Sequence, residues 1–114
     1  MISDSRMTDY LHSLESGQGC LLDEIEKKAG RDRIPIIRRE TAALLRTLIY
    51  ASKPGKILEI GTAVGYSALM MCQAMPQNGR IVTIEKYEKR IEEARKNFLR
   101  AGVGEKITLM EGDA

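Results

Sequence analysis

The most informative run of this sequence is Ile57-Leu58-Glu59-Ile60-Gly61-Thr62-Ala63-Val64-Gly65. Its apolar start, together with Lys56, predicts a short β-strand over residues 56–60. The two glycines that follow allow unusual backbone dihedral angles and a close approach of the backbone to a ligand. Residues 66–75 have the pattern of a helix, which Pro76 closes. We therefore predict a strand, a glycine loop and a helix in succession.

The alternation of strands and helices continues toward the C-terminus. A turn at Asn78-Gly79 precedes a predicted strand over 80–85, and a third predicted strand covers 106–111. Strands that alternate with helices pair in parallel through right-handed crossovers. The chain is therefore predicted to have an α/β fold, with the first three strands of a Rossmann-like doubly wound parallel sheet. The helix between the last two strands ends at Gly102, and its apolar face is formed by Ile91, Ala94, Phe98 and Ala101.

Three amphipathic helices are predicted before residue 54. Gly17 is a plausible end of the first helix, Gly30 a left-handed cap of the second, and the third should end before Lys53-Pro54-Gly55. We divide the chain into an N-terminal helical cap on the substrate side, residues 1–53, and the first half of a Rossmann-like domain, residues 54–114. The apolar faces are formed by Met7, Tyr10, Leu11 and Leu14 in the first helix, Leu21, Leu22, Ile25 and Ala29 in the second, and Leu44, Leu45, Leu48 and Ile49 in the third.

The composition is that of an ordinary globular protein. Of the 114 residues, 43% are hydrophobic and 30% are charged, and the net charge of +2 is too small to indicate a nucleic-acid-binding protein by itself. Cys20 and Cys72 lie far apart in apolar helical patterns, which favours reduced thiols over a disulfide. No apolar run approaches the roughly 20 residues that span a bilayer. We expect a cytoplasmic protein that does not contact a membrane.

Carboxylates at the strand tips indicate a nucleoside site. Glu85 ends the second strand 20 residues after Gly65, the spacing at which an acid accepts hydrogen bonds from ribose hydroxyls. Asp113 follows the third strand at its tip and could accept from the adenine amino group, while Ala114 leaves room beside the ring. Structural explanations stay open: in these, the glycines form only a tight turn, Glu85 is a solvated strand end, and Asp113 is a helix N-cap.

The loop sequence distinguishes between adenosine-containing ligands. A dinucleotide site uses Gly-x-Gly-x-x-Gly to hold a pyrophosphate, but Ala63 replaces the middle glycine and no third glycine follows. S-adenosylmethionine carries no phosphate, and Glu59 would favour its ammonium and sulfonium groups electrostatically. Alternatively, Glu59 braces the amides of the loop. An NAD-binding oxidoreductase and a non-catalytic fragment remain the rival hypotheses from other classes.

These residues resemble a known family. The run 57–68 resembles the first motif of the metal-dependent O-methyltransferases that include catechol and caffeoyl-coenzyme A O-methyltransferases. Residues 82–85 and 111–114 resemble its next two motifs, and Ile34-Pro35-Ile36-Ile37 resembles the segment that folds over the cofactor. Within the family, the chain looks closest to the bacterial branch that methylates 5-hydroxyuridine at the tRNA wobble position. The chain is expected to be the N-terminal half of such a protein.

The resemblance implies roles for individual residues. Ser67 would bind the methionine carboxylate of S-adenosylmethionine, and Ile37 would touch the cofactor through its apolar side. Glu85 would bind the ribose. The family's divalent-metal ligands and catalytic lysine follow its fourth and fifth strands, so we assign no metal ligand and no catalytic residue to this chain. The implied cofactor-binding residues are Ile37, Glu59, Gly61, Ser67, Glu85, Asp113 and Ala114.

The resemblance also implies partners. The whole protein would use a divalent metal, with Mg²⁺ as the leading candidate, and would form a homodimer. A basic run near the N-terminal cap is a possible phosphate footprint for tRNA, although no aromatic residues interleave with it and a solvated helix end explains it equally well. A small catechol-like phenol is the alternative substrate. The basic run consists of Lys27, Lys28, Arg31, Arg33, Arg38 and Arg39.

Overall fold

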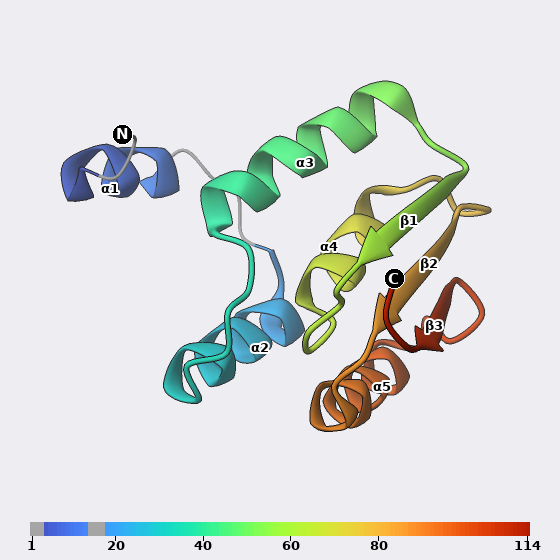
Figure 1. The fold of residues 1–114 in the computed structure, drawn as a ribbon. Coiled ribbons are helices and arrows are strands. Elements are labelled where there is room, and N and C mark those ends of the chain that lie inside the picture. Colours follow the sequence, from blue (N-terminus) through green and yellow to red (C-terminus); the bar gives the residue numbers. More distant parts are fainter. Residues whose placement is uncertain (1–3, 14–17) are drawn as a thin grey trace.

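The computed structural model describes residues 4–13 and 18–114 and has the predicted alternation of helices and strands (Figure 1). Three helices precede the first strand, and each later pair of strands is joined by a helix. In chain order the elements are α1 (Ser5–Ser13), α2 (Cys20–Arg31), α3 (Arg39–Ser52), β1 (Lys56–Ile60), α4 (Tyr66–Ala74), β2 (Arg80–Glu85), α5 (Glu88–Ala101) and β3 (Ile107–Glu111).

The three strands form one parallel sheet in the order β1-β2-β3. Ile57 pairs with Ile81, and Ile81 pairs with Ile107, so the three strands are in register along the sheet. The predicted α/β class and parallel sheet are confirmed. The predicted bounds of β1 and β2 are correct, and β3 begins one residue later than predicted.

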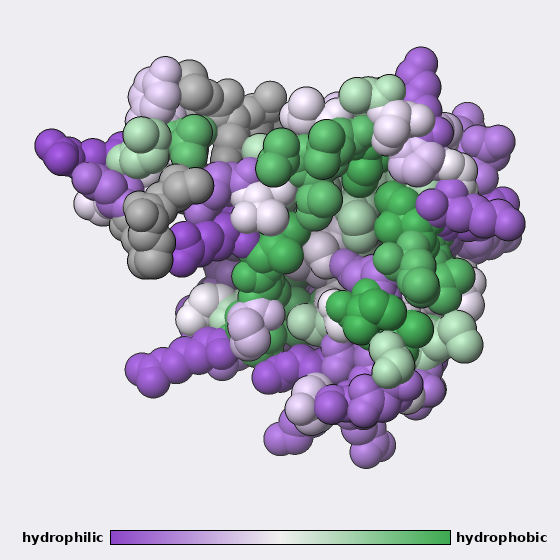
Figure 2. All heavy atoms as spheres, turned by 45° about the horizontal axis from the view of Figure 1, so that its top comes forward, coloured by the Kyte–Doolittle hydropathy of each residue, from purple (hydrophilic) through white to green (hydrophobic). Residues whose placement is uncertain are grey.

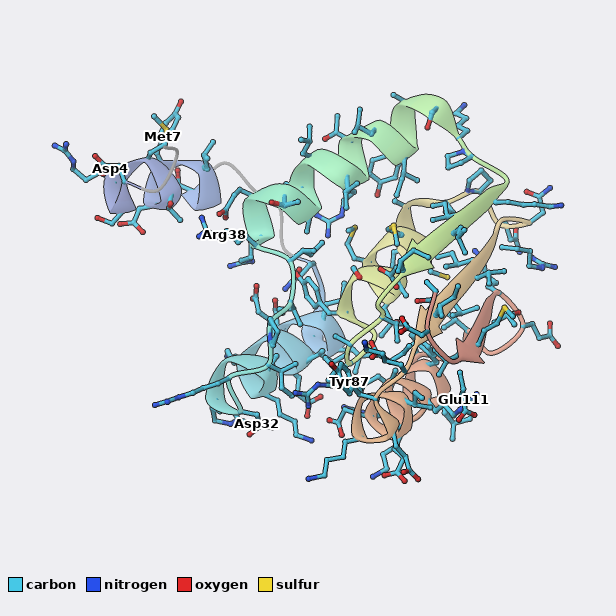
Figure 3. The ribbon with its side chains drawn as sticks, viewed as in Figure 1. Asp4, Met7, Asp32, Arg38, Tyr87 and Glu111 are labelled. Carbon is cyan, nitrogen blue, oxygen red and sulfur yellow. The ribbon has the colours of Figure 1, made fainter. Side chains whose placement is uncertain are left out.

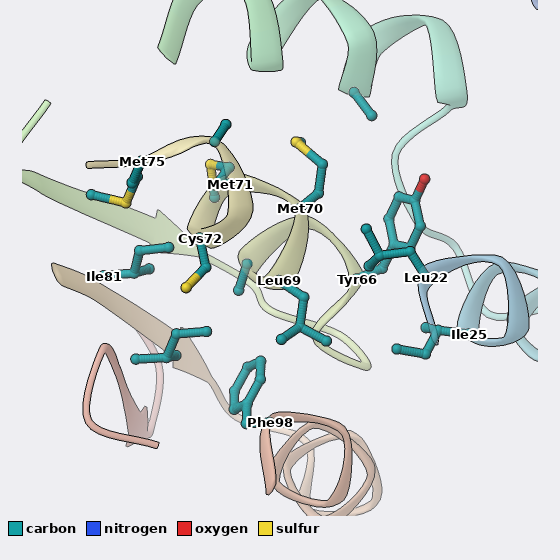
Figure 4. Packing of buried hydrophobic residues seen from close by; sticks show 14 of the residues in the cluster. Leu22, Ile25, Tyr66, Leu69, Met70, Met71, Cys72, Met75, Ile81 and Phe98 are labelled. Carbon is teal, nitrogen blue, oxygen red and sulfur yellow. The ribbon is translucent and has the colours of Figure 1, made fainter. Parts of the chain in front are cut away.

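The core lies between one face of this sheet and helices α4 and α5. Helix α4 is buried nearly all round, because it packs against α2 and α3 as well as the sheet. Met70 is fully buried, and Met71 and Met75 are buried as well, so these three methionines belong to the core. Figure 4 shows this cluster, with Leu69 and Phe98 between α4 and α5.

The opposite face of the sheet is apolar and exposed. Leu58 retains 65% of its accessible surface and Met110 retains 53%. Parallel sheets usually have both faces covered. Figure 2 shows broad apolar patches on the surface of the molecule. In this view the top of Figure 1, where α3 lies, is turned toward the reader.

The N-terminal helices differ from the predicted pattern in two respects. Met7, Tyr10, Leu44 and Leu48 lie on predicted apolar faces but are exposed. In α2, Gly30 is not the left-handed cap. The helix continues to Arg31, and Arg33 takes the positive φ of 56°.

A backbone hydrogen bond explains the later end of α2. The N–H of Ile34 donates to the carbonyl of Ala29 at 2.8 Å, and the Ile34 side chain packs against the core. This contact places the reversal of the chain after Arg31 instead of at Gly30. The predicted roles of Leu14 and Gly17 in the first helix lie outside the described residues. Among residues 4–13 and 18–114, no helix has the length and apolar character that crossing a bilayer requires.

Candidate functional site

The loop after β1 takes an unusual backbone path. Gly61, Ala63 and Gly65 all have positive φ angles, of 83°, 49° and 90°. The N–H of Gly65 donates to the carbonyl of Thr62 at 2.8 Å, and this bond closes the turn before α4. A Cβ atom on Gly61 would meet nothing within 4 Å, so this side of the loop is open. The predicted glycine loop therefore exists and exposes backbone toward the tips of the strands.

Glu85 holds this loop in place. Its side chain is only 7% exposed, so the alternative of a solvated strand-end carboxylate is wrong. Oε1 accepts a hydrogen bond from the backbone N–H of Ala63 at 2.8 Å. Oε2 accepts from the N–H groups of Lys86 and Tyr87 at 3.1 and 3.2 Å. The carboxylate thus joins the glycine loop to the segment that leads into α5.

A cavity of about 620 Å³ opens at the carboxyl ends of the three strands. This volume falls within the range of roughly 300–1,000 Å³ that is typical of small-molecule sites. Its lining combines the apolar side chains of Ile60 and Ile84 with charged residues such as Glu85 and Asp113. Four of the seven predicted cofactor-binding residues line it: Gly61, Glu85, Asp113 and Ala114.

Asp113 lies at the rim of the cavity, beyond the end of β3. The N–H of Gly112 donates to the carbonyl of Glu85 at 2.9 Å, which keeps the tip of β3 beside the tip of β2. The Asp113 carboxylate lies 3.8 Å from Lys86 Nζ, and its side chain is 81% exposed. Lys86 Nζ also lies 5.3 Å from the ring centre of Tyr87, a cation–π contact just before α5.

Glu59 and Ser67 contact each other and do not line the large cavity. Glu59 Oε1 accepts from the Thr83 hydroxyl at 2.7 Å, and Glu59 Oε2 accepts from the Ser67 hydroxyl. Glu59 therefore accepts hydrogen bonds from one side-chain hydroxyl group of β2 and one of α4. The single hydroxyl proton of Ser67 points to Glu59, so binding a ligand carboxylate at Ser67 would require this hydroxyl to turn.

The segment before α3 contributes one residue to the cavity. Pro35 lines it, whereas Ile37 is half-buried against the core. The segment 34–37 therefore approaches the site. Ile37 itself does not line the cavity, so its contact with a ligand stays a prediction.

Tyr66 anchors the N-terminal cap to the start of α4. It is 1% exposed, and its hydroxyl donates to Gln18 Oε1 at 2.6 Å. Gln18 in turn donates to Asp23 in α2 at 3.0 Å. Burial raises the pKa of the Tyr66 phenol, and the charge of Glu26 raises it further.

Two residues of α5 support the loop, and neither was among the predicted site residues. Asn97 is 4% exposed, and its Nδ2 donates to the carbonyl of Val64 at 2.8 Å. The Phe98 ring fills the space beside Gly65, where an added Cβ would lie 2.7 Å from Cε1. The sequence carries a signal for burial of Asn97, since an amide stands three residues after Ala94 on the apolar face of the helix, but no signal for its partner.

Metal ligands do not gather in the part of the chain that the structure describes. No group of three His, Cys, Asp or Glu side chains in residues 4–13 and 18–114 is placed to hold a metal ion. The side chain of His12 lies outside this description. Cys20 and Cys72 are free thiols, the first exposed and the second buried.

The chain is similar in sequence and in structure to known methyltransferases. A catechol O-methyltransferase from Niastella koreensis is 39% identical over 70 residues, which cover 61% of this chain and 32% of that protein. The structure of the methyltransferase PaMTH1 from Podospora anserina, bound to S-adenosylhomocysteine, matches 96% of this chain with a TM-score of 0.87 and 31% identity. The structure of TomG from Streptomyces achromogenes, an O-methyltransferase in complex with S-adenosylmethionine, matches 98% with a TM-score of 0.83 and 28% identity.

The chain spans about a third of the length of its curated relative and about half of the two solved structures, at 49% and 52%. The family model for O-methyltransferases matches residues 12–114, which is nearly the whole chain. With the parallel sheet, the glycine loop and the strand-tip carboxylate all in place, the chain belongs to the O-methyltransferase family.

Proposed function

We propose that the cavity at the strand tips binds S-adenosylmethionine and that the whole protein is an S-adenosylmethionine-dependent O-methyltransferase. The observation that carries the proposal is the buried carboxylate of Glu85, which braces the glycine loop and lines the cavity. Two structural neighbours were solved with S-adenosylhomocysteine or S-adenosylmethionine bound. The loop lacks the glycines that a pyrophosphate needs, which disfavours a dinucleotide.

The hydrogen-bonding capacity of Glu85 fits a ribose. A carboxylate has about four lone-pair sites, and three backbone N–H groups occupy three of them. The remaining site is on Oε1, which has a single partner, Ala63. Glu85 can therefore accept one direct hydrogen bond from a ribose hydroxyl and keep its hydrogen bond to the loop.

The rest of the cavity fits the remaining parts of an adenosine. Ile60 and Ile84 provide apolar side chains, and Gly112 and Ala114 leave space beside them for a flat ring. Asp113 is exposed at the rim, where its carboxylate can accept from an adenine amino group. Glu59 precedes this loop by two residues, and a carboxylate there would attract the ammonium group of S-adenosylmethionine, although Glu59 does not line the cavity.

Bound S-adenosylmethionine supplies an electrophilic methyl group on sulfur, which an oxygen nucleophile can accept. The described residues would hold the adenosine. The acceptor and a divalent metal, for which Mg²⁺ is our candidate, would be held by other parts of the whole protein. Such a metal would hold the substrate oxygens and lower the pKa of the reacting hydroxyl. We also keep homodimer formation and a cytoplasmic location as proposals.

Our leading acceptor is 5-hydroxyuridine at the wobble position of tRNA. Three arginines of the cap, Arg31, Arg33 and Arg38, are exposed and would suit a phosphate backbone, and of these Arg38 Nη1 lies 3.9 Å from Glu40. Two other members of the basic run are engaged within the protein: Lys28 Nζ lies 2.6 Å from Glu93, and Arg39 Nε lies 3.8 Å from Glu26. Arg38 lies at the start of α3 (Figure 3).

The alternative acceptor is a small catechol-like phenol. It is favoured by the curated relatives, since proteins from Niastella koreensis and Mycobacterium tuberculosis that match this chain are catechol O-methyltransferases. A catechol and a 5-hydroxyuridine both present two neighbouring oxygens to a metal. The family chemistry is therefore the same, and the size and charge of the acceptor distinguish the two.

A methyl-transfer assay with the full-length protein tests this proposal. S-adenosylmethionine labelled in the methyl group is incubated with Mg²⁺ and either tRNA that carries 5-hydroxyuridine or the same tRNA with uridine. Catechol and phenol form the second matched pair. Label in the hydroxylated tRNA alone supports the leading acceptor, and label in catechol alone supports the alternative. The absence of label in both, with a protein that binds no S-adenosylmethionine, contradicts the proposed function.

A further inference from the structure

We infer that Asn97 is a positioning residue for the cofactor, acting through the backbone of the glycine loop. This inference rests on the proposed function, because it concerns the same cavity. Asn97 does not line that cavity. It is buried in α5, 33 residues after the carbonyl that it binds.

The peptide group between Val64 and Gly65 is held at both ends. Its carbonyl accepts from Asn97 Nδ2 at 2.8 Å, and its N–H donates to the carbonyl of Thr62 at 2.8 Å. Val64 and Asn97 are 3% and 4% exposed, so water has little access to replace the bond between them. A buried carbonyl that has lost its hydrogen-bond partner destabilises the folded protein by the full cost of its desolvation. The orientation of this peptide therefore depends on Asn97.

Three consecutive loop residues each have one fixed partner outside the loop. Glu85 of β2 holds Ala63 through its N–H, Asn97 of α5 holds Val64 through its carbonyl, and the Phe98 ring limits the space at Gly65. The first partner lines the cavity, and the other two approach from the side of α5. In Figure 1 the loop after β1 lies between α2 and α5, in agreement with a smaller pocket that residues of both helices share with Val64.

Holding the loop in this way prepares the site for its ligand. Ala63 has a positive φ of 49°, which costs a residue with a side chain about 1–2 kcal/mol. Such a conformation persists only where its surroundings fix it. When the loop is already ordered, the ligand does not need to order it on binding, and affinity rises. Loss of the Asn97 amide should therefore weaken cofactor binding although Asn97 never touches the cofactor.

The test compares Asn97→Asp with Ile91→Val in the full-length protein. The aspartate keeps the size of the side chain but places an oxygen against the Val64 carbonyl. Ile91 is buried in the same helix, does not line the cavity, and serves as a control for a general loss of stability. Dissociation constants for S-adenosylhomocysteine are measured by calorimetry at a temperature where circular dichroism shows all three proteins folded.

We expect Asn97→Asp to weaken binding of S-adenosylhomocysteine by tenfold or more, and Ile91→Val to change it by less than twofold. Hydrogen exchange of the free protein should also show faster exchange of the Gly65 amide in Asn97→Asp. Should this variant not fold, Asn97→Ala takes its place in both measurements. If a folded Asn97 variant binds S-adenosylhomocysteine as tightly as the wild type, the role of Asn97 is overturned and the proposed function stands. If the wild type itself binds no S-adenosylhomocysteine, both are overturned.

Discussion

Glu85 Oε1 accepts a hydrogen bond from the backbone N–H of Ala63 at 2.8 Å, so a carboxylate at the tip of β2 fixes the loop that follows β1. The same side chain accepts from the N–H groups of Lys86 and Tyr87. It therefore supports the site structurally and lines the cavity as well. These two roles can be tested separately.

Replacing Glu85 by glutamine should lower the free energy of unfolding by about 1–3 kcal/mol, because one acceptor oxygen becomes a donor that faces a backbone N–H group. The measurement is urea denaturation followed by circular dichroism. Glu88→Gln removes the same charge from an exposed residue of the cavity rim and should change stability by less than about 0.5 kcal/mol. Equal effects of the two substitutions would contradict the bracing role of Glu85.

Gly65→Ala should destabilise the protein by about 2–4 kcal/mol. The new Cβ would lie 2.7 Å from the Phe98 ring, and the φ of 90° is unfavourable for a residue with a side chain. Gly30→Ala is the matched control, since Gly30 lies inside α2 and an added Cβ there meets nothing within 4 Å. That control should stabilise the protein by roughly 0.5–1 kcal/mol through its higher helix propensity. A harmless Gly65→Ala would show that the loop does not have the described backbone path.

Stability should fall in alkaline solution because of two buried groups. Burial raises the pKa of the Cys72 thiol from its ordinary value of 9.0, and burial also raises that of the Tyr66 phenol from 10.0. The unfolded chain then loses these protons at a lower pH than the folded protein does. Their contribution to stability is therefore fully present below about pH 9 and is lost as the pH rises above it.

The measurement is the free energy of unfolding in urea from pH 7 to pH 11. The decline should be smaller in Cys72→Ala and in Tyr66→Phe than in the wild type. At pH 7, Tyr66→Phe should also cost about 1–2 kcal/mol, because Gln18 Oε1 loses its donor. If stability falls as steeply at alkaline pH in both variants as in the wild type, groups other than Cys72 and Tyr66 cause the fall.

The two faces of the sheet should respond differently to a polar residue. Ile81 is 1% exposed and faces α4 and α5, so Ile81→Thr should cost about 2–4 kcal/mol in the 114-residue chain. Leu58 is 65% exposed on the other face, and Leu58→Thr should cost less than about 0.5 kcal/mol. Urea denaturation at low protein concentration measures both. A large cost for Leu58→Thr would show that this face is covered in solution.

The sequence predicted the parallel sheet well because its local signals agree. Apolar runs define the strands, and Gly102 ends α5 with the left-handed conformation, with a φ of 69°, that its lack of a side chain favours. The helical cap was predicted less well. Leu44 and Leu48 recur at helical spacing, yet both are exposed, because periodicity indicates an apolar face without showing whether another element covers it.

The candidate site was predicted in part. Glu85 was identified from its spacing to Gly65, and the structure adds that its carboxylate binds the loop itself. Its contact with Ala63 depends on a positive φ at a residue other than glycine, which no sequence pattern indicates. Asn97 was missed because its partner is a backbone carbonyl 33 residues away. Every residue has such a carbonyl, so the sequence does not indicate which one Asn97 binds.

The identity of the cofactor that the cavity accepts decides the function of this protein. The decisive measurement is calorimetric titration of this chain with S-adenosylhomocysteine and, in parallel, with NAD, repeated with a folded Glu85→Ala variant. We predict that the wild type binds S-adenosylhomocysteine and not NAD, and that the substitution weakens the binding at least tenfold. Binding of NAD alone, or binding of S-adenosylhomocysteine that Glu85→Ala leaves unchanged, would contradict the assignment of this cavity.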